Sequence, residues 1–280
     1  MVHTGSILGS DLGEGAMNDD NLVLVGTRQT KSGNVATVIV NNPAKANCFG
    51  RATMRAFVDK VTALHDVFEL RCVVVTGAGE RAFIGGADVR EMAGLDPDEA
   101  RKFITLVHQT CAGLRTLPVP VIAQINGAVL GAGLELAASC DFRIAADHAT
   151  FGMPEVRLGM PSVVEAALLP QLIGWGRTRR LLLTGATIDA AQAERWGLVE
   201  EVVPLAELDA ATERAVDAIL ASGSRAVRLQ KRLIQGWETQ TIDGAIRAGV
   251  ECFSEAWTSD EPRRMTAGFL RARARSAPKE

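Results

Sequence analysis

Apolar and polar positions follow two different rhythms along the chain. Residues 22–26 and 35–40 are short β-branched runs separated by Lys31-Ser-Gly-Asn34, a combination that predicts a β-hairpin. Residues 51–70 instead repeat apolar side chains at helical spacing and predict an amphipathic helix. The apolar stripe of that helix consists of Met54, Phe57, Val58, Val61 and Leu64.

The same alternation of strand-like and helix-like segments continues beyond the hairpin. Strands are predicted at 71–76, 118–125, 141–145 and 198–203, and helices at 99–117 and directly after Gly131. From Glu165 onward the pattern is almost entirely helical. Strand–helix repeats followed by helices favour an α/β core with a helical C-terminal region. We therefore expect an N-terminal extension at 1–20, a core at 21–204 and a helical region at 205–280.

Composition narrows the classes of function. The formal net charge of the 280 residues is −3, so no overall positive field favours nucleic acid or a membrane surface. No apolar run approaches the ~18 residues that cross a bilayer. The five cysteines are widely spaced without a Cys-x-x-Cys pair, which favours buried free thiols and a cytoplasmic location. The histidines are not spaced as a metal cluster, so we expect no metal.

The stretch Gly131-Ala132-Gly133-x-Glu135 carries the strongest chemical signal. Small residues at the start of an apolar helix let the backbone approach a ligand, and the unpaired N–H groups there suit a developing negative charge. Glu135 follows about one turn later, close enough to act on whatever those amides hold. We interpret this stretch as half of an active site.

Two further segments can complete that site. Gly85-Gly-Ala87-Asp88 ends a strand region, and Asp88-x-x-Glu91 has the form of a capping box that directs the amide near Ala87 toward the same kind of target as Ala132. Glu155 follows Pro154 among apolar residues. Two carboxyl groups in apolar surroundings can divide general acid and general base work, although each Glu alone is weak support.

With these motifs assembled, the chain resembles the crotonase (enoyl-CoA hydratase/isomerase) superfamily from about Leu22 to about Arg275. The matching stretches are Pro43-Ala-Lys-Ala-Asn47, Gly85-Gly-Ala-Asp88, Asn126 to Asp141, Phe151-Gly-Met-Pro-Glu155, Leu183 to Ala190 and Trp196 to Pro204. The resemblance implies a ββα-spiral core with a helical trimerisation region, in a homotrimer or a dimer of trimers. It also implies an acyl-CoA substrate, with coenzyme A as part of that substrate and no separate cofactor.

The resemblance also implies roles for individual residues. The amides of Ala87 and Ala132 would hold the thioester oxygen. Glu135 would activate the water that attacks Cβ of a 2-enoyl group, and Glu155 would hold that water and deliver a proton to Cα. The positions that would contact the CoA moiety or the substrate are Lys45, Ala46, Asn47, Arg81, Gly85, Ala87, Asp88, Arg90 and Gly131. Cationic side chains suit the CoA phosphates, although Arg81 and Arg90 also fit as solvated residues.

The sequence departs from the typical hydratase in the loop after Glu155. This loop contains Pro161-Ser-Val-Val-Glu165, where the typical hydratase has a glycine-rich run. Glu165 is better explained as a helix N-terminal acid than as a third catalytic group. The altered loop keeps a second hypothesis open, namely isomerisation, dehydration of a polar acyl-CoA or decarboxylation. The Arg-rich residues 263–279 are best interpreted as a solvated or interface helix. They are also the one feature that suggests a third hypothesis, a non-catalytic relative that binds acyl-CoA or RNA.

Overall fold

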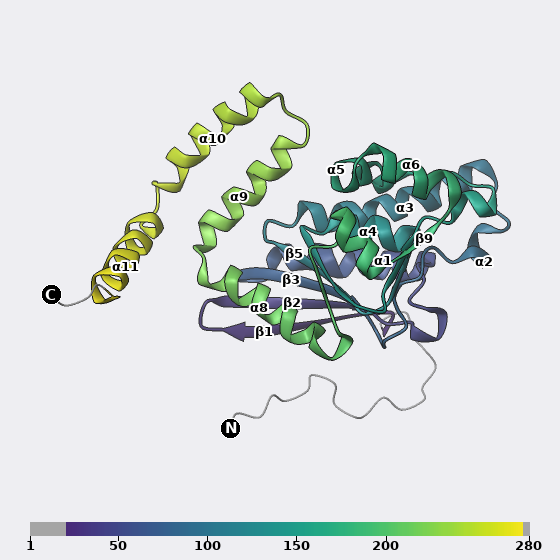
Figure 1. Cartoon of the computed structure of the whole chain (residues 1–280), viewed down its shortest axis with the longest axis horizontal. Coiled ribbons are helices and arrows are strands. Elements are labelled where there is room, and N and C mark those ends of the chain that lie inside the picture. Colours follow the sequence, from purple (N-terminus) through teal and green to yellow (C-terminus); the bar gives the residue numbers. More distant parts are fainter. Residues whose placement is uncertain (1–20, 277–280) are drawn as a thin grey trace.

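The larger of two β-sheets carries the predicted hairpin at its edge. The structure, a computed structural model, describes residues 21–276 (Figure 1), so the extension predicted at 1–20 lies outside the described residues. The sheet order is β1-β2-β3-β5-β7-β10, with the β1–β2 hairpin antiparallel and all other pairs parallel. The strands are β1 (Val23–Thr30), β2 (Gly33–Val40), β3 (Leu70–Gly77), β5 (Val121–Ile125), β7 (Phe142–Ala146) and β10 (Glu201–Val203).

A second, smaller sheet has four short strands in the order β4-β6-β8-β9. These are β4 (Ala82–Ile84), β6 (Ala128–Leu130), β8 (Thr150–Gly152) and β9 (Thr187–Asp189). Along the chain, β3, β5 and β7 of the larger sheet are each followed by one strand of the smaller sheet and then by a helical segment. This repetition is the ββα spiral that the resemblance implies, and it confirms the predicted α/β fold class.

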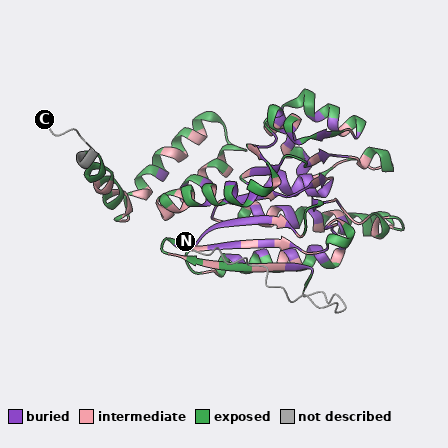
Figure 2. Cartoon of the chain, turned by 60° about the horizontal axis from the view of Figure 1, so that its bottom comes forward, coloured by how far each residue is buried: buried purple, intermediate pink, exposed green. Residues whose placement is uncertain are grey.

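Helices cover the sheets and fill the space around them (Figure 1). Those of the core are α1 (Arg51–Ala63), α2 (Val89–Met92), α3 (Pro97–Thr116), α4 (Ala132–Ser139), α5 (Leu169–Ile173), α6 (Trp175–Thr184) and α7 (Ala190–Trp196). α1 packs against α3, and α3 packs against α4. The predicted stripe of α1 enters this core, where Met54, Phe57, Val61 and Leu64 are buried. Figure 2 shows the buried residues concentrated in these inner layers.

Helix α4 lies inside the molecule, and all eight of its residues are buried. Such a position requires a small residue on the face toward β4. A Cβ added to Gly133 would lie 2.1 Å from the carbonyl oxygen of Ile84, so only glycine permits this approach. The close contact between α4 and β4 fixes where the N-terminus of α4 points.

Some predicted element boundaries differ from the structure. The helix predicted over 51–70 ends at Ala63 and continues only as a 3-10 turn to Asp66, since Val67 is extended with ψ 115°, and Glu69 then takes a left-handed φ of 49° before β3 starts. β5 begins at Val121 rather than 118, since Pro118 and Pro120 lack the N–H groups that a ladder needs.

The predicted capping box at Asp88 is wrong in one half. Asp88 does cap α2, and its carboxylate accepts a hydrogen bond from the backbone N–H of Arg90 at 3.0 Å. The N–H of Asp88, which a capping box would direct to the carboxylate of Glu91, donates to the carbonyl oxygen of Phe49 at 2.9 Å. The carboxylate of Glu91 instead accepts from the N–H of Arg51 at 3.0 Å. The start of α1 has no side-chain cap at its own N-cap residue, and the carboxylate of Glu91 provides the acceptor there instead of completing a capping box at α2.

The C-terminal helices leave the core as an arm (Figure 1). α8 (Leu208–Ala221) still packs on the larger sheet, while α9 (Ser224–Trp237), α10 (Ile242–Ala256) and α11 (Glu261–Ser276) extend away from it. Lys231 anchors α9 to the core, because its buried Nζ donates to the carbonyl oxygen of Val119 and to Asp141, both at 2.8 Å. The described residues include no helix with the length and apolar character to cross a membrane.

The other end of α4 is held by Arg143 of β7, which is only 2% exposed. Its guanidinium donates to the carbonyl oxygens of Ala137 and Cys140 at the C-terminus of α4, and to that of Leu198. A cation at a helix C-terminus is favourable, and here it also satisfies buried acceptors. Glu200 completes the arrangement by pairing with Arg143 from a half-exposed position.

Removing the side chain of Arg143 should therefore lower the free energy of unfolding more than neutralising its ion-pair partner Glu200. We expect Arg143→Ala to lower the free energy of unfolding by about 3 kcal/mol, because three buried carbonyl oxygens lose the guanidinium donors and, within the described residues, that of Ala137 alone keeps another donor, the N–H of Cys140. Glu200→Gln keeps those donors and should cost less than about 1 kcal/mol. Urea unfolding at one fixed protein concentration measures both, and equal costs would contradict this account of how α4 is held.

Candidate active site

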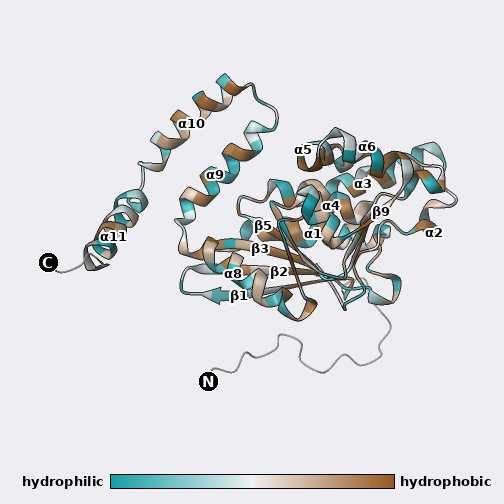
Figure 3. Ribbon diagram, viewed as in Figure 1, coloured by the Kyte–Doolittle hydropathy of each residue, from teal (hydrophilic) through white to brown (hydrophobic). Residues whose placement is uncertain are grey.

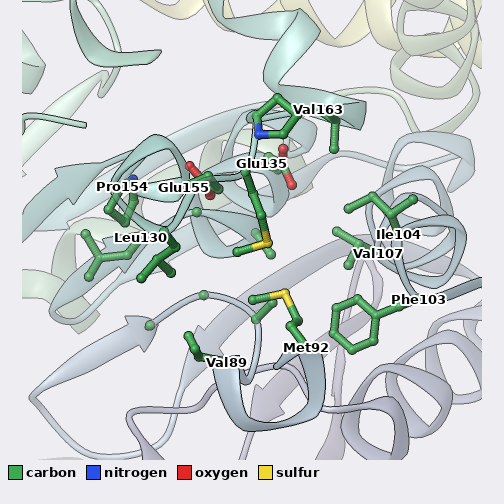
Figure 4. A pocket seen from close by; sticks show the side chains of 18 residues that line it. Val89, Met92, Phe103, Ile104, Val107, Leu130, Glu135, Pro154, Glu155 and Val163 are labelled. Carbon is green, nitrogen blue, oxygen red and sulfur yellow. The ribbon is translucent and has the colours of Figure 1, made fainter. Parts of the chain in front are cut away.

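A pocket of about 130 Å³ opens at the N-terminal end of α4, beside α2, α3 and the 3-10 helix η4 (Glu155–Leu158) (Figure 4). Among the described residues that line it, only Glu135 and Glu155 are ionisable. The apolar side chains of the lining are Val89, Met92, Phe103, Ile104, Val107, Leu130, Pro154, Leu158, Met160, Pro161 and Val163. The sequence motifs predicted the two acids and several glycines and alanines here, but not the apolar wall from α2 and α3.

Ala87 presents its backbone to this pocket because its neighbours are bonded elsewhere. Phe49 accepts from the N–H of Asp88 at 2.9 Å and donates to the carbonyl oxygen of Gly86 at 2.8 Å, which makes a parallel bridge with Ala87. In such a bridge the N–H of the central residue points away from the partner strand. Within residues 21–276, no acceptor is found for the N–H of Ala87, and Ala87 lines the pocket.

Ala132 supplies a second unpaired N–H from the first position of α4. Gly131 before it has φ 52° and ψ −121°, a conformation that only glycine adopts readily. The N–H groups of Leu134 and Glu135 bond back to the carbonyl oxygen of Gly131, whereas in the described part of the chain that of Ala132 finds no acceptor. The structure thus brings the amides of Ala87 and Ala132 to one pocket, as the sequence predicted.

Glu135 lies one turn into α4 and is only 4% exposed. Burial, and after it the nearby charges of Glu155 and Glu165, raise the pKa of its carboxyl to about 8. Backbone N–H groups of Ala166 and Val163 offset part of this effect. In the free site, Glu135 therefore holds its proton at neutral pH and releases it above that range.

Glu155 enters the pocket from η4 and lies against the start of α4. A Cβ added to Gly131 would be 2.4 Å from Oε1 of Glu155, so the glycine also makes room for this acid. The other oxygen, Oε2, accepts a hydrogen bond from the Ser162 hydroxyl at 2.7 Å. Figure 4 shows the two carboxyl groups on the same side of the pocket, across from Met92. Ser162 was not predicted here, because only the fold of the loop turns it back toward Glu155.

The loop at 45–47 packs beside the pocket, but its three residues differ in exposure. Lys45 is exposed and lies 3.9 Å from the carboxylate of Asp88, and Ala46 accepts a hydrogen bond from the N–H of Gly85 at 2.9 Å. The side chain of Asn47 is fully buried, and the CoA contact expected at this position stays a prediction.

The buried side chain of Asn47 holds the loop together. Its amide donates to the carbonyl oxygens of Ala78 and Ala82, and its own oxygen accepts from the N–H of Asn42. With every polar atom of the amide engaged inside the protein, Asn47 shapes the loop and does not face the pocket.

The two predicted arginines lie outside the pocket lining. Arg81 precedes β4 and Arg90 belongs to α2, and both are exposed. Their side chains are free to meet a ligand at the surface, which leaves both predictions for them open. Within the described residues, no cluster of three or more His, Cys, Asp or Glu side chains could hold a metal ion.

The unusual loop after Glu155 places Val163 in the pocket lining. Glu165 lies, as predicted, in the first turn of a short helix, the 3-10 helix η5 (Val164–Leu168), and it is only 4% exposed. Its Oε1 lies 2.7 Å from Nδ1 of His108 on α3. Sequence reasoning gave His108 no role, because the two residues are 57 positions apart.

The raised pKa of Glu135 predicts a pH-dependent stability. A buried carboxyl that keeps its proton to about pH 8 when folded, and loses it near 4.5 when unfolded, stabilises the fold less as pH rises between those values. We expect Glu135→Gln, which mimics the protonated form, to remove this loss. The variant should match the wild type near pH 5 and exceed it by up to ~1.4 kcal/mol per pH unit toward pH 8. Urea unfolding across this range, with the exposed Glu207→Gln as control, tests the difference, and parallel curves would contradict it.

Comparisons with known proteins agree with this geometry. Residues 30–275 match the family described as enoyl-CoA hydratase/isomerase. The chain is 35% identical to a short-chain-enoyl-CoA hydratase of Clostridium acetobutylicum and 38% identical to a crotonyl-CoA hydratase of Syntrophomonas wolfei, each over 87% of this chain and 94% of the relative. The crystal structure of an enoyl-CoA hydratase from Bacillus anthracis superposes with a TM-score of 0.83 at 31% identity, covering 89% of this chain and 96% of that one. The chain belongs to the enoyl-CoA hydratase/isomerase family.

Proposed function

We propose that this protein is an enoyl-CoA hydratase that adds water across the 2,3 double bond of a short 2-enoyl-CoA. The observation that carries the proposal is the meeting of two unpaired amides, of Ala87 and Ala132, with two carboxyl groups, of Glu135 and Glu155, in one otherwise apolar pocket. The names of the related hydratases support the same reaction.

The amides supply the electrostatic part of the mechanism. When water adds at Cβ, negative charge develops on the thioester oxygen as an enolate forms. The N–H groups of Ala87 and Ala132 point into the pocket in advance and donate to that oxygen. Each preorganised donor of this kind lowers the barrier by about 3 kcal/mol.

The glutamates supply the proton transfers. Glu135 in its basic form takes a proton from water as the hydroxyl group bonds to Cβ, and Glu155 orients the water and delivers a proton to Cα. One water is consumed; Glu135 ends with an added proton and Glu155 without one, and transfer of that proton from Glu135 to Glu155 returns both carboxyls to their starting state. Ser162 fixes the rotamer of Glu155 through its 2.7 Å hydrogen bond. No cofactor is required, since coenzyme A enters as part of the substrate.

The size of the pocket favours a short acyl chain. Its volume of about 130 Å³ compares with roughly 150 Å³ for an apolar cavity that accepts benzene. A four-carbon enoyl group fits such a space, in line with the short-chain and crotonyl substrates named for the relatives. Lys45, Arg81 and Arg90 are the exposed cationic side chains that we expect to meet the CoA phosphates.

A second candidate reaction follows from the loop at 161–165. Val163 narrows the pocket, and the carboxyl of Glu165 lies buried close behind it. These features favour an acyl-CoA other than a simple enoyl chain, in a dehydration, isomerisation or decarboxylation through the same enolate. Mass spectrometry of products from a panel of acyl-CoAs distinguishes these reactions from hydration.

Substitution of the glutamates tests the mechanism. Glu135→Gln and Glu155→Gln should each lower kcat for crotonyl-CoA by about 100-fold or more, because each loses a proton-transfer group. Acyl-CoA binding should persist, since the amides of Ala87 and Ala132 remain. Loss of the conjugated thioester absorbance measures the rate, with Glu207→Gln as the unaffected control. Full activity in the doubly substituted protein would refute the proposal.

The exposed apolar face of α10 supports the proposed homotrimer or dimer of trimers. This face consists of Ile242, Ile246, Val250 and Phe253, which are 61–78% exposed in the single chain (Figure 3). So large an apolar stripe is typical of an interface.

The four cysteines that lie buried as free thiols support a reducing, cytoplasmic setting.

Light scattering should give three or six times the 29.8 kDa chain mass. Phe253→Glu places a charge in the apolar face of α10 and should shift the mass toward the single chain, whereas Glu251→Ala on the opposite side of the helix should not. A stable wild-type monomer would contradict the proposed assembly.

A further inference from the structure

A carboxyl group that the proposed reaction does not use lies directly behind the pocket. Glu165 is 4% exposed, and its Oε1 lies 2.7 Å from Nδ1 of His108. Its second oxygen, Oε2, is buried without a hydrogen-bond partner in the described part of the chain. A buried carboxyl with one oxygen unsatisfied is costly, so its place next to the pocket calls for a functional reason.

The backbone before Glu165 is bent to bring this side chain inward. Val164 has φ 38°, a left-handed conformation that is strained for a β-branched residue. The bend lets Val163 line the pocket, while Glu165, two positions later, turns into the protein interior. The loop therefore holds the carboxyl at a fixed place against α3 and α4, the helices on which η5 packs.

Few ionisable groups face Glu165 from the elements around it. α3 contributes His108 and the thiol of Cys111, and α4 contributes Glu135. The neighbouring α5 contains no ionisable residue. The charge of Glu165 therefore acts on both Cys111 and Glu135, and it does so through the protein interior, where little water screens it. It is one of the causes that raise the pKa of Glu135, after burial and Glu155.

We propose that Glu165, held by His108, is a positioning residue that sets the pH at which Glu135 gives up its proton and so the pH range of the reaction. The inference rests on the proposed hydratase function. The His108 side chain is 53% exposed, whereas that of Glu165 is 4% exposed, so the imidazole holds the carboxyl from the solvent side.

Neutralising Glu165 without removing its bulk tests the inference. In Glu165→Gln, the midpoint of kcat/KM against pH should move toward acid by about one unit, because a like charge near Glu135 is gone. Infrared difference spectra of the substrate-free protein measure the pH at which Glu135 is half protonated, from the intensity of its carboxyl band. This band is assigned by its loss in Glu135→Gln. Glu165→Met provides a second neutral variant if the first does not fold.

Two controls separate the charge from the packing. Glu207→Gln removes an exposed carboxylate and should leave both midpoints unchanged. His108→Gln keeps the carboxylate of Glu165 and a neutral donor beside it, so the midpoint should not move toward acid.

Unchanged infrared midpoints in folded Glu165→Gln and Glu165→Met would overturn the inference, even if activity fell uniformly. A shifted infrared midpoint in a protein that hydrates no enoyl-CoA would support the control of Glu135 by Glu165 and refute the proposed function instead.

Discussion

The burial of α4 is the constraint on which the rest of the structure depends. A helix that is buried along its whole length must have its end groups satisfied by the protein or by a ligand. At its C-terminus, Arg143 provides the donors. At its N-terminus, the amide of Ala132 is left for the pocket. The helix can take this position because Gly133, which has no side chain, allows close contact with Ile84. The absence of a Cβ at this one residue therefore fixes the direction of the Ala132 N–H.

The same burial separates the properties of the two acids. Glu135 belongs to the buried helix, and the interior keeps a proton on it up to about pH 8. Glu155 comes from a short 3-10 helix at the pocket wall, where the Ser162 hydroxyl bonds to it. Two residues of the same type thus take different environments from the elements that carry them, which is the condition for acid and base work in one site.

Local patterns and motifs were sufficient to predict the α/β class, the hairpin, the two amides and the two acids. Each depends on residues close together in the sequence. The contacts that sequence reasoning missed, His108 with Glu165 and Ser162 with Glu155, depend on how loops fold back. Asn47 was assigned to the ligand because its motif matched, yet its amide is used to close its own loop. Glu91 likewise caps the start of α1 rather than that of α2. The local sequence around α2 does not show that the start of a second helix, 40 positions away in the chain, also needs this carboxylate.

The contact between Gly131 and Glu155 has an evolutionary consequence. No atom fits between the glycine and the carboxylate, so the backbone that presents one oxyanion donor also sets the depth of the acid. A lineage that changes this helix start alters both functions at once. The loop at 161–165 is tied to the acids as well, because Ser162 bonds to Glu155 and Glu165 lies buried against α4. A change of substrate in this scaffold is therefore least disruptive at apolar wall residues such as Ile104 and Val107 of α3, which the reaction does not use.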